Sequence, residues 1–233
     1  MSYSKRFLQF IRIWQEDFGI ESSIDSYLCE DKDGNPLPWY TYPAIEYLVQ
    51  FDYSEKRVFE FGCGYSSLFW ANRAHSVIGI ENNTQWFVKW QHYFHRPNLS
   101  IRFIPEDKLY SQAILDENGM FDVIIIDGRC RCDCVRSAIT KLAPNGFIIL
   151  DDSDRTNTSK EYSEAIKTLK ENNLLQVDFY GFCPMNNYPK ATSIFFSRNF
   201  NFSTLSPVQP INGIGNLWGK SRKARKEFYK ENK

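Results

Sequence analysis

The chain has 233 residues, of which 42% are hydrophobic and 24% charged, and its length is that of a single α/β domain. The 28 basic and 28 acidic residues cancel, so no overall positive field attracts nucleic acid, and we expect no nucleic-acid partner. The sequence has no long uncharged apolar run, and charges interrupt its apolar N-terminus. We therefore expect no transmembrane segment, no signal peptide, and a cytoplasmic protein whose cysteines are reduced.

Residues 1–55 are predicted to form a helical N-terminal segment. Four apolar residues repeat at helical spacing: Phe7, Phe10, Ile11 and Trp14. The turn-rich stretch 31–38 then leads into a second helical stretch. Two interpretations stay open. The segment could be a lid that only covers the edge of a sheet, or its aromatic residues Trp39, Tyr40 and Tyr42 could line a ligand pocket.

Seven short apolar runs alternate with helical stretches after this segment. Strands are predicted at 56–61, 76–81, 100–105, 121–127, 146–151, 175–182 and 191–198. Helices are predicted at 66–74, 84–95, 111–117, 132–142 and 159–172. The connection before the last strand is too short for a crossover, so that strand should run antiparallel. The sequence thus predicts an α/β fold: a Rossmann-like open sheet of seven strands, mostly parallel with the last antiparallel, and helices on both faces.

The predicted organisation has three parts. Residues 1–55 form the helical lid or substrate-side segment, 56–200 the sheet domain with the cofactor site, and 201–233 a C-terminal extension. Residues 220–233 carry seven Lys or Arg against two Glu. This basic tail is either a solvated terminal helix or a contact for a membrane surface or polyanion.

The stretch VFEFGCGYSS (58–67) places Glu60 at the end of a strand and Gly62 and Gly64 in the turn that follows. Glycines let the backbone turn tightly and let a ligand approach without a Cβ in the way. Ser66 and Ser67 then supply hydroxyls and backbone N–H groups at the start of a helix, where an anionic group can bind, and Tyr65 is also expected to contact the cofactor. The sequence therefore predicts a cofactor site at this turn.

The second predicted strand ends in another acid, Glu81. At the switch point of such a sheet an acid in this position accepts hydrogen bonds from ribose hydroxyls, although it could also only cap the next helix. The turn and Glu81 together resemble the class I S-adenosylmethionine-dependent methyltransferases over residues 58–198. The resemblance implies an enzyme that binds S-adenosylmethionine, with Glu60 at the methionine ammonium, Gly62 and Gly64 beside the methionine, and Glu81 at the ribose. It places Asn82, and Glu106 or Asp107, near the adenine.

Two other classes compete with this interpretation. A nicotinamide-dependent oxidoreductase would share the glycines, but its fingerprint needs a third glycine where this chain has Ser67. A carboxylate at the turn would also repel a pyrophosphate. A non-catalytic module that only holds the nucleoside cofactor would share every feature of the turn.

Three acids follow the fourth and fifth predicted strands: Asp127, Asp151 and Asp152. They should converge at the carboxyl edge of the sheet, where clustered carboxylates need a cation or a shared proton. This pattern resembles the metal-dependent O-methyltransferases related to the catechol and caffeoyl-CoA enzymes and to the macrolide sugar methyltransferases. It implies that the three acids are catalytic and bind Mg²⁺, and that the acceptor is a small hydroxylated molecule such as a sugar or a phenol.

One departure from that pattern concerns the catalytic base. The catechol-type lysine after the first metal-binding Asp is absent, and Arg129 and Arg131 in its place are too basic to accept a proton. We expect them to bind an anionic substrate or to pair with the acids. The alternative to the metal is that Asp127 or Asp152 acts as the base, or only holds the acceptor, without an ion.

The remaining polar residues give weaker signals. Four residues before the last strand either reach the acceptor or only form a turn: Asn186, Asn187, Tyr188 and Lys190. Three histidines are expected to be structural or exposed: His75, His92 and His95. The alternating cysteines Cys130, Cys132 and Cys134 lack a fourth ligand, so we expect no metal there. The sequence leaves the acceptor's identity and the oligomeric state open.

Overall fold

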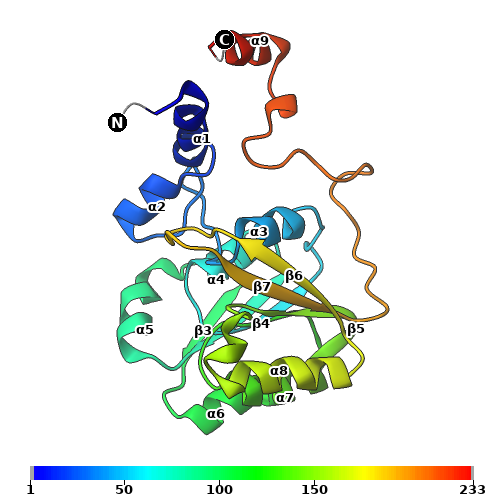
Figure 1. Cartoon of the computed structure of the whole chain (residues 1–233). Coiled ribbons are helices and arrows are strands. Elements are labelled where there is room, and N and C mark those ends of the chain that lie inside the picture. Colours follow the sequence, from blue (N-terminus) through cyan, green and yellow to red (C-terminus); the bar gives the residue numbers. More distant parts are fainter. Residues whose placement is uncertain (1–2, 232–233) are drawn as a thin grey trace.

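The computed structural model describes residues 3–231, and in that part of the chain seven strands form one sheet in the order β3-β2-β1-β4-β5-β7-β6 (Figure 1). The strands are β1 Arg57–Phe61, β2 Ser76–Glu81, β3 Leu99–Phe103, β4 Phe121–Ile126, β5 Leu142–Leu150, β6 Leu175–Gly181 and β7 Lys190–Phe196. β1 to β5 pair in parallel, whereas β7 is antiparallel to both β5 and β6. The predicted Rossmann-like sheet is therefore confirmed, including its reversed last strand.

The helices are α1 Lys5–Glu16, α2 Ile20–Ser26, α3 Tyr42–Leu48, α4 Tyr65–Ala71, α5 Thr84–Trp90, α6 Asp107–Gln112, α7 Arg131–Lys141, α8 Lys160–Glu171 and α9 Arg222–Glu231. The helix predicted at 111–117 begins four residues earlier, at Asp107, because the acidic pair after Pro105 suits a helix N-terminus. That helix ends at Gln112 and continues as a 3₁₀ turn, Ala113–Asp116. The helix predicted at 84–95 also ends early, at Trp90.

Alternate side chains of each strand pack on opposite faces of the sheet. One core cluster joins Val58 and Ile125 of the sheet to α3, to α4 and to the chain before β1. The other joins Phe59 and Ile124 to α6, α7 and α8. Strands covered on both faces are apolar on both faces, which explains the continuous apolar runs of β4 and β5.

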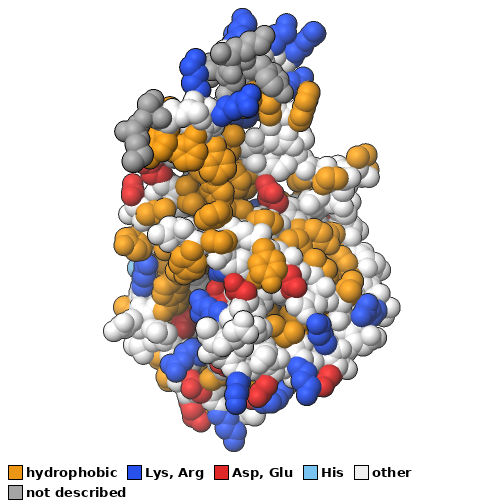
Figure 2. All heavy atoms as spheres, viewed as in Figure 1, with side chains coloured by type: hydrophobic (Ala, Val, Ile, Leu, Met, Phe, Trp, Pro, Cys, Tyr) orange, Lys and Arg blue, Asp and Glu red, His pale blue; other side chains and the backbone are white. Residues whose placement is uncertain are grey.

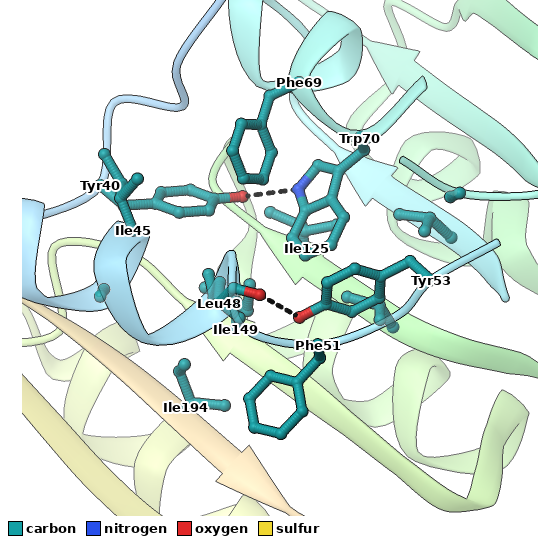
Figure 3. Packing of buried hydrophobic residues seen from close by; sticks show 14 of the residues in the cluster. Tyr40, Ile45, Leu48, Phe51, Tyr53, Phe69, Trp70, Ile125, Ile149 and Ile194 are labelled. Carbon is teal, nitrogen blue, oxygen red and sulfur yellow. Dashed lines mark hydrogen bonds between the residues drawn. The ribbon is translucent and has the colours of Figure 1, made fainter. Parts of the chain in front are cut away.

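The segment before β1 shares the core of the sheet. Figure 3 shows Tyr40 beside Trp70 of α4, whose indole N–H donates to the Tyr40 hydroxyl at 3.4 Å. The Tyr53 hydroxyl donates to the carbonyl of Leu48 at 3.0 Å. Tyr40 and Tyr42 are buried in this cluster. Of the two interpretations left open, the lining of the pocket is therefore wrong for Tyr40 and Tyr42, whose side chains fill core, whereas Trp39 lines the cavity described below.

The C-terminal extension runs back along the molecule to the N-terminal helix. Phe202 is still part of the core, and α9 lies at the same end of the molecule as α1 (Figure 1). Among residues 3–231, each helix is too short or too polar to cross a bilayer.

Candidate cofactor and active site

A cavity of about 390 Å³ opens where β1, β2, β4 and β5 end. Nine of the residues predicted for the site line it: Gly62, Gly64, Tyr65, Ser66, Glu81, Asn82, Asp127, Asp151 and Asp152. Glu60 and Asp107 lie outside its wall. Its size is that of a small-molecule site, and its wall combines aromatic rings with a few convergent polar groups.

The two glycines of the first turn serve different purposes. Gly62 has φ +89°, and a Cβ there would lie 2.8 Å from the backbone nitrogen of Gly128, which follows β4. Gly64 has an extended backbone that any residue adopts, and a Cβ would meet the Trp86 ring at an ordinary 3.5 Å. The turn therefore requires glycine only at Gly62, and Gly64 borders the cavity beside the Trp86 ring.

Glu60 is fully buried behind this turn. The hydroxyl of Ser67 donates to its carboxylate and accepts from the backbone N–H of Gly64 at 3.2 Å. Burial raises the pKa of Glu60 to about 8, against the hydrogen bonds from Ser66 and Ser67, which lower it. Among the described residues, no donor reaches Glu60 Oε1. A buried acceptor without a donor is unusual and is satisfied when a ligand or a water supplies one.

Glu81 is held in place by three backbone N–H groups. Its Oε1 accepts from Asn82 and Asn83 at 2.8 Å each, and its Oε2 accepts from Cys63 at 3.2 Å. Burial raises the pKa of Glu81, and these three hydrogen bonds oppose the shift. Glu81 thus ties the glycine turn to the approach of α5, and Oε2 keeps a lone pair for a ligand.

Asp107 reaches the site only through Asn82. It is the first residue of α6, it is exposed, and its carboxylate accepts from the Asn82 side-chain amide at 2.9 Å. Asn82 itself lines the cavity. The structure therefore places Asp107 behind Asn82, where it fixes the direction of that amide.

Trp86 and Trp90, which were not predicted for the site, form one wall of the cavity together with Tyr65. Trp86 and Trp90 lie four residues apart on α5, with ring centroids 5.3 Å apart, and both line the cavity. The Tyr65 ring lies 5.1 Å from that of Trp90, and its hydroxyl donates to Glu30 at 3.2 Å. The sequence signal for this wall is the i, i+4 spacing of two tryptophans in the helix after Glu81, because residues four apart lie on the same face of a helix.

The three predicted acids converge, with carboxylate oxygens within 4.8 Å of one another. Lys190, the first residue of β7, donates to Asp151 Oδ2 and, at 3.1 Å, to Asp152 Oδ1. The Thr192 hydroxyl donates to Asp151 Oδ1 at 2.6 Å and accepts from the backbone N–H of Thr41 at 3.0 Å. Both oxygens of Asp151 are thus bonded, and the segment before β1 is bonded to the acid cluster through Thr192.

A second cation enters the cluster from α7. Arg131 is buried and its guanidinium pairs with Asp127 at 3.2 Å and with Asp152 at 3.5 Å. The exposed Arg155 adds a third pair, at 3.0 Å from Asp152. Of the two roles expected for Arg131, the structure shows the pairing with nearby acids. Arg129 is exposed at the rim of the cavity.

Asp127 differs from its two neighbours. Its side chain is 23% exposed, against 1% for Asp151 and 12% for Asp152. Arg131 bonds its Oδ1, and within the described chain its Oδ2 accepts no hydrogen bond. Burial and the charge of Asp151 raise the pKa of Asp127 to about 7, although Arg131 and Lys190 lower it. Asp127 is therefore the carboxylate that a ligand can reach.

The β6–β7 loop closes another side of the cavity. Asn186 is buried and accepts from the Trp39 indole N–H at 3.0 Å, and both residues line the cavity together with Tyr188. Asn187 is exposed and lies outside the wall. Lys190 also borders the cavity, but its ammonium is bonded to Asp151 and Asp152. Of the interpretations left open for Lys190, contact with the acceptor therefore gives way to a structural role.

The other candidates lie elsewhere. His75, His92 and His95 are exposed and away from the cavity, as expected. The alternating cysteines also form no metal site in the described part of the chain. Cys132 faces Glu164, whereas the Cys134 thiol donates to the carbonyl of Arg129.

Comparison with known proteins identifies the fold. Family models and curated protein sequences give no match to this chain. A putative O-methyltransferase from Klebsiella pneumoniae superposes with a TM-score of 0.51 at 17% identity, over 67% of this chain and 77% of that protein. The precorrin-6y C5,15-methyltransferase of Geobacter metallireducens GS-15 gives 0.51 at 14%, over 66% and 87%. This chain has the class I methyltransferase fold.

Proteins with this methyltransferase fold differ in their acceptors. Fibrillarin from Aeropyrum pernix, solved with S-adenosyl-L-methionine bound, matches with a TM-score of 0.51 at 16% identity, over 66% of this chain and 72% of that protein. A putative rRNA methylase from Clostridium thermocellum matches with 0.50 at 13%, over 71% and 99%. The fold therefore does not distinguish a small acceptor from RNA, and only the residues of the site can indicate the class of acceptor.

Proposed function

We propose that this chain transfers a methyl group from S-adenosylmethionine to a hydroxyl group of a small molecule such as a sugar or a phenol. One observation carries the proposal: a single cavity is lined both by Gly62, Gly64 and Glu81 at the ends of β1 and β2 and by Asp127 at the end of β4. A donor held by the first group would place its methyl toward the acids, and positioning of this kind supplies much of the rate of methyl transfer.

The residues at the glycine turn fit the methyl donor. The unpartnered Oε1 of Glu60 suits the methionine ammonium, directly or through water, and the backbone of Gly64, which has no side chain and lines the cavity, suits the methionine chain. Glu81 Oε2 has a lone pair for a ribose hydroxyl, and Asn82 borders the place for the adenine. S-adenosylmethionine, when bound, supplies an electrophilic methyl group whose C–S bond breaks as the acceptor oxygen forms the new C–O bond.

Asp127 is the proposed base. Alcohols and phenols hold their protons at neutral pH, so a nearby acceptor for that proton lowers the barrier. Asp127 Oδ2 is unbonded and borders the cavity, and its pKa of about 7 lets it exist as the carboxylate and still hold a proton. In this scheme Asp127 takes the proton of the acceptor hydroxyl, and Arg131 keeps the carboxylate in place.

The acid cluster does not fit Mg²⁺ in the arrangement observed. Three carboxylates are matched by three cations, Lys190, Arg131 and Arg155, and the oxygens of Asp151 and Asp152 are all bonded. A divalent ion would have to displace the Lys190 ammonium from a buried pair, which costs several kcal/mol. We therefore propose that methyl transfer proceeds without a metal, and Lys190 holds the position that the metal-dependent resemblance gives to the ion.

A binding measurement tests the cofactor. The purified chain is titrated calorimetrically with S-adenosylhomocysteine and, separately, with NADH. We expect saturable binding of the first only, weakened about tenfold by Glu81→Gln, where a hydrogen bond to an ionised group is lost. Glu55→Gln, an exposed carboxylate away from the cavity, is the matched control. Binding of NADH with no response to the nucleoside would disprove the proposal.

A turnover assay tests the acceptor and the metal. Sugars and phenols are incubated with S-adenosylmethionine, and release of S-adenosylhomocysteine is measured with and without EDTA. We expect turnover that EDTA leaves unchanged. Loss of activity on chelation and recovery with Mg²⁺ would overturn the metal-free scheme. Tight cofactor binding without methylation of any acceptor would instead identify a binding module.

A further inference from the structure

The N-terminal helix α1 carries an apolar face that the described chain leaves uncovered. Phe7, Leu8 and Phe10 are 44%, 52% and 54% exposed, and among the residues of α1 none is buried. The helix is strongly amphipathic, and such a helix in a globular protein normally packs its apolar face on a core. A contiguous exposed apolar face of this kind marks an interaction surface.

Aromatic rings connect this face to the cavity. Neighbouring rings lie in a row on and beside α1, with centroids 5.0, 6.4, 6.1 and 4.6 Å apart, in the order Tyr3, Phe7, Phe10, Trp14 and Phe18. Trp14 also lies 5.2 Å from Phe182 in the β6–β7 loop, and other residues of that loop line the cavity. The row of rings is thus exposed at one end and contacts the β6–β7 loop at the other.

A strongly basic helix lies alongside. Lys220 pairs with Asp17 at 3.2 Å, and α1 and α9 together line a groove of about 210 Å³. Arg222, Lys223 and Lys226 form no ion pair with the side chains that the structure describes, which exclude that of Glu231. Figure 2 shows the basic side chains at this end of the molecule above a broad apolar band. The seven basic and two acidic residues of 220–233 leave the rest of this neutral chain net acidic.

We infer that the α1–α9 surface, meaning the apolar face of α1 and the basic residues of 220–230, binds the surface of an anionic lipid bilayer. Aromatic and aliphatic side chains on one helix face, with Lys and Arg beside them, are the pattern of helices that lie in a membrane interface. Clusters of four to eight basic residues attract anionic headgroups. The net acidic body would be repelled, so the charge distribution also orients the molecule.

Two other partners fit the same surface less well. A second copy of the chain would bring an equal positive charge to the contact. A single-stranded nucleic acid would match the charge and needs ring faces for base stacking. Phe7 and Phe10, however, already lie stacked on each other at an interplanar angle of 26°, and Leu8 offers no ring.

The test is co-sedimentation of the whole chain with vesicles, and it does not depend on methyl transfer. We expect binding to vesicles of phosphatidylcholine with phosphatidylglycerol, weakening as salt rises, and little binding to phosphatidylcholine alone. Phe7→Ser with Phe10→Ser, and Lys223→Glu with Lys226→Glu, should each lower the partition coefficient about tenfold or more. Circular dichroism checks that each variant is folded.

Matched control pairs exist on the same chain. Leu205→Ser with Val208→Ser removes two apolar residues that are 67% and 74% exposed in the extension, and Lys160→Glu with Lys170→Glu reverses two exposed charges on α8. Both controls should bind vesicles like the unaltered protein. Absence of vesicle binding, equal loss in the controls, a dimer that the Phe7 and Phe10 changes dissociate, or retention of an RNA oligonucleotide in place of vesicles would each overturn the inference.

Discussion

The two ends of the cavity stabilise buried carboxylates in opposite ways. At the cofactor end, Glu60 and Glu81 are held by neutral donors, a serine hydroxyl and backbone amides, and neither forms an ion pair in the described chain. At the acid end, Lys190 and Arg131 are built into the cluster. The first end keeps carboxyl oxygens available for a ligand that brings a cation and hydroxyls. At the second end three cations match three carboxylates, and Asp127 is the most exposed of the three.

The largest effect is expected at Lys190. Lys190→Met removes the cation between Asp151 and Asp152 and should lower the free energy of unfolding by about 3–5 kcal/mol, because two buried carboxylates are left facing each other. Urea denaturation measures this. Because the variant leaves the oxygens of Asp151 and Asp152 free for a cation, Mg²⁺ should raise its melting temperature and leave that of the unaltered protein unchanged. A variant as stable as the parent would show that Lys190 does not neutralise the pair.

Asp127→Asn tests the reacting group. The amide cannot accept the proton, so kcat/KM should fall at least about 100-fold, while affinity for S-adenosylhomocysteine stays the same. In the unaltered protein Asp127 must be ionised to act, so kcat/KM should rise with pH through about 7, following its raised pKa. The residual activity of the variant should lack this rise. An unchanged pH profile in Asp127→Asn would assign the base elsewhere.

The two glycines of the cofactor end should respond differently to the same change. Gly62→Ala places a Cβ at φ +89° and against Gly128, and should destabilise the fold by about 2–3 kcal/mol. Gly64→Ala keeps an allowed backbone and an ordinary contact with Trp86, so it should leave stability within about 0.5 kcal/mol and weaken cofactor binding. Thermal denaturation and calorimetry separate the two outcomes, and equal destabilisation by both would contradict the assignment.

The last effect depends on pH and concerns the charge of Glu60. Its pKa of about 8 in the folded protein lies above its ordinary value of 4.5, so the folded state holds an extra proton between these values and stability falls as pH rises through this range. Glu60→Gln removes this dependence. Without cofactor, the variant should gain stability over the parent by up to about 1.4 kcal/mol for each pH unit between pH 5 and pH 8, with little difference near pH 5. The same difference at both pH values would argue against the raised pKa.

The sheet and the cofactor turn could be predicted because their signals are local. The alternation of apolar runs with helical stretches gave each strand, and the short connection before β7 gave its direction. Gly62 follows β1 directly and Glu81 is the last residue of β2, so both positions could be predicted from the strand ends. The convergence of Asp127 with Asp151 and Asp152 followed in the same way.

Pairing of Arg131 with the acids was one of two roles expected for it, but the ion pairs of Lys190 with Asp151 and Asp152 could not be predicted from the sequence. Lys190 lies 38 residues from Asp152, and only the pairing of β7 with β5 brings them together. The burial of Tyr40 and Tyr42 depends on how the N-terminal segment packs, which their spacing does not specify. The separation of residues 1–55, 56–200 and 201–233 as units stays a prediction, although side chains from all three ranges share one core cluster.

The N-terminal segment is bonded to the acid cluster at the carboxyl edge of the sheet. The backbone N–H of Thr41 donates to Thr192, and the Thr192 hydroxyl donates to Asp151. A shortened chain that begins at residue 55 would lack Thr41, and with it the hydrogen bond that holds the Thr192 hydroxyl beside Asp151.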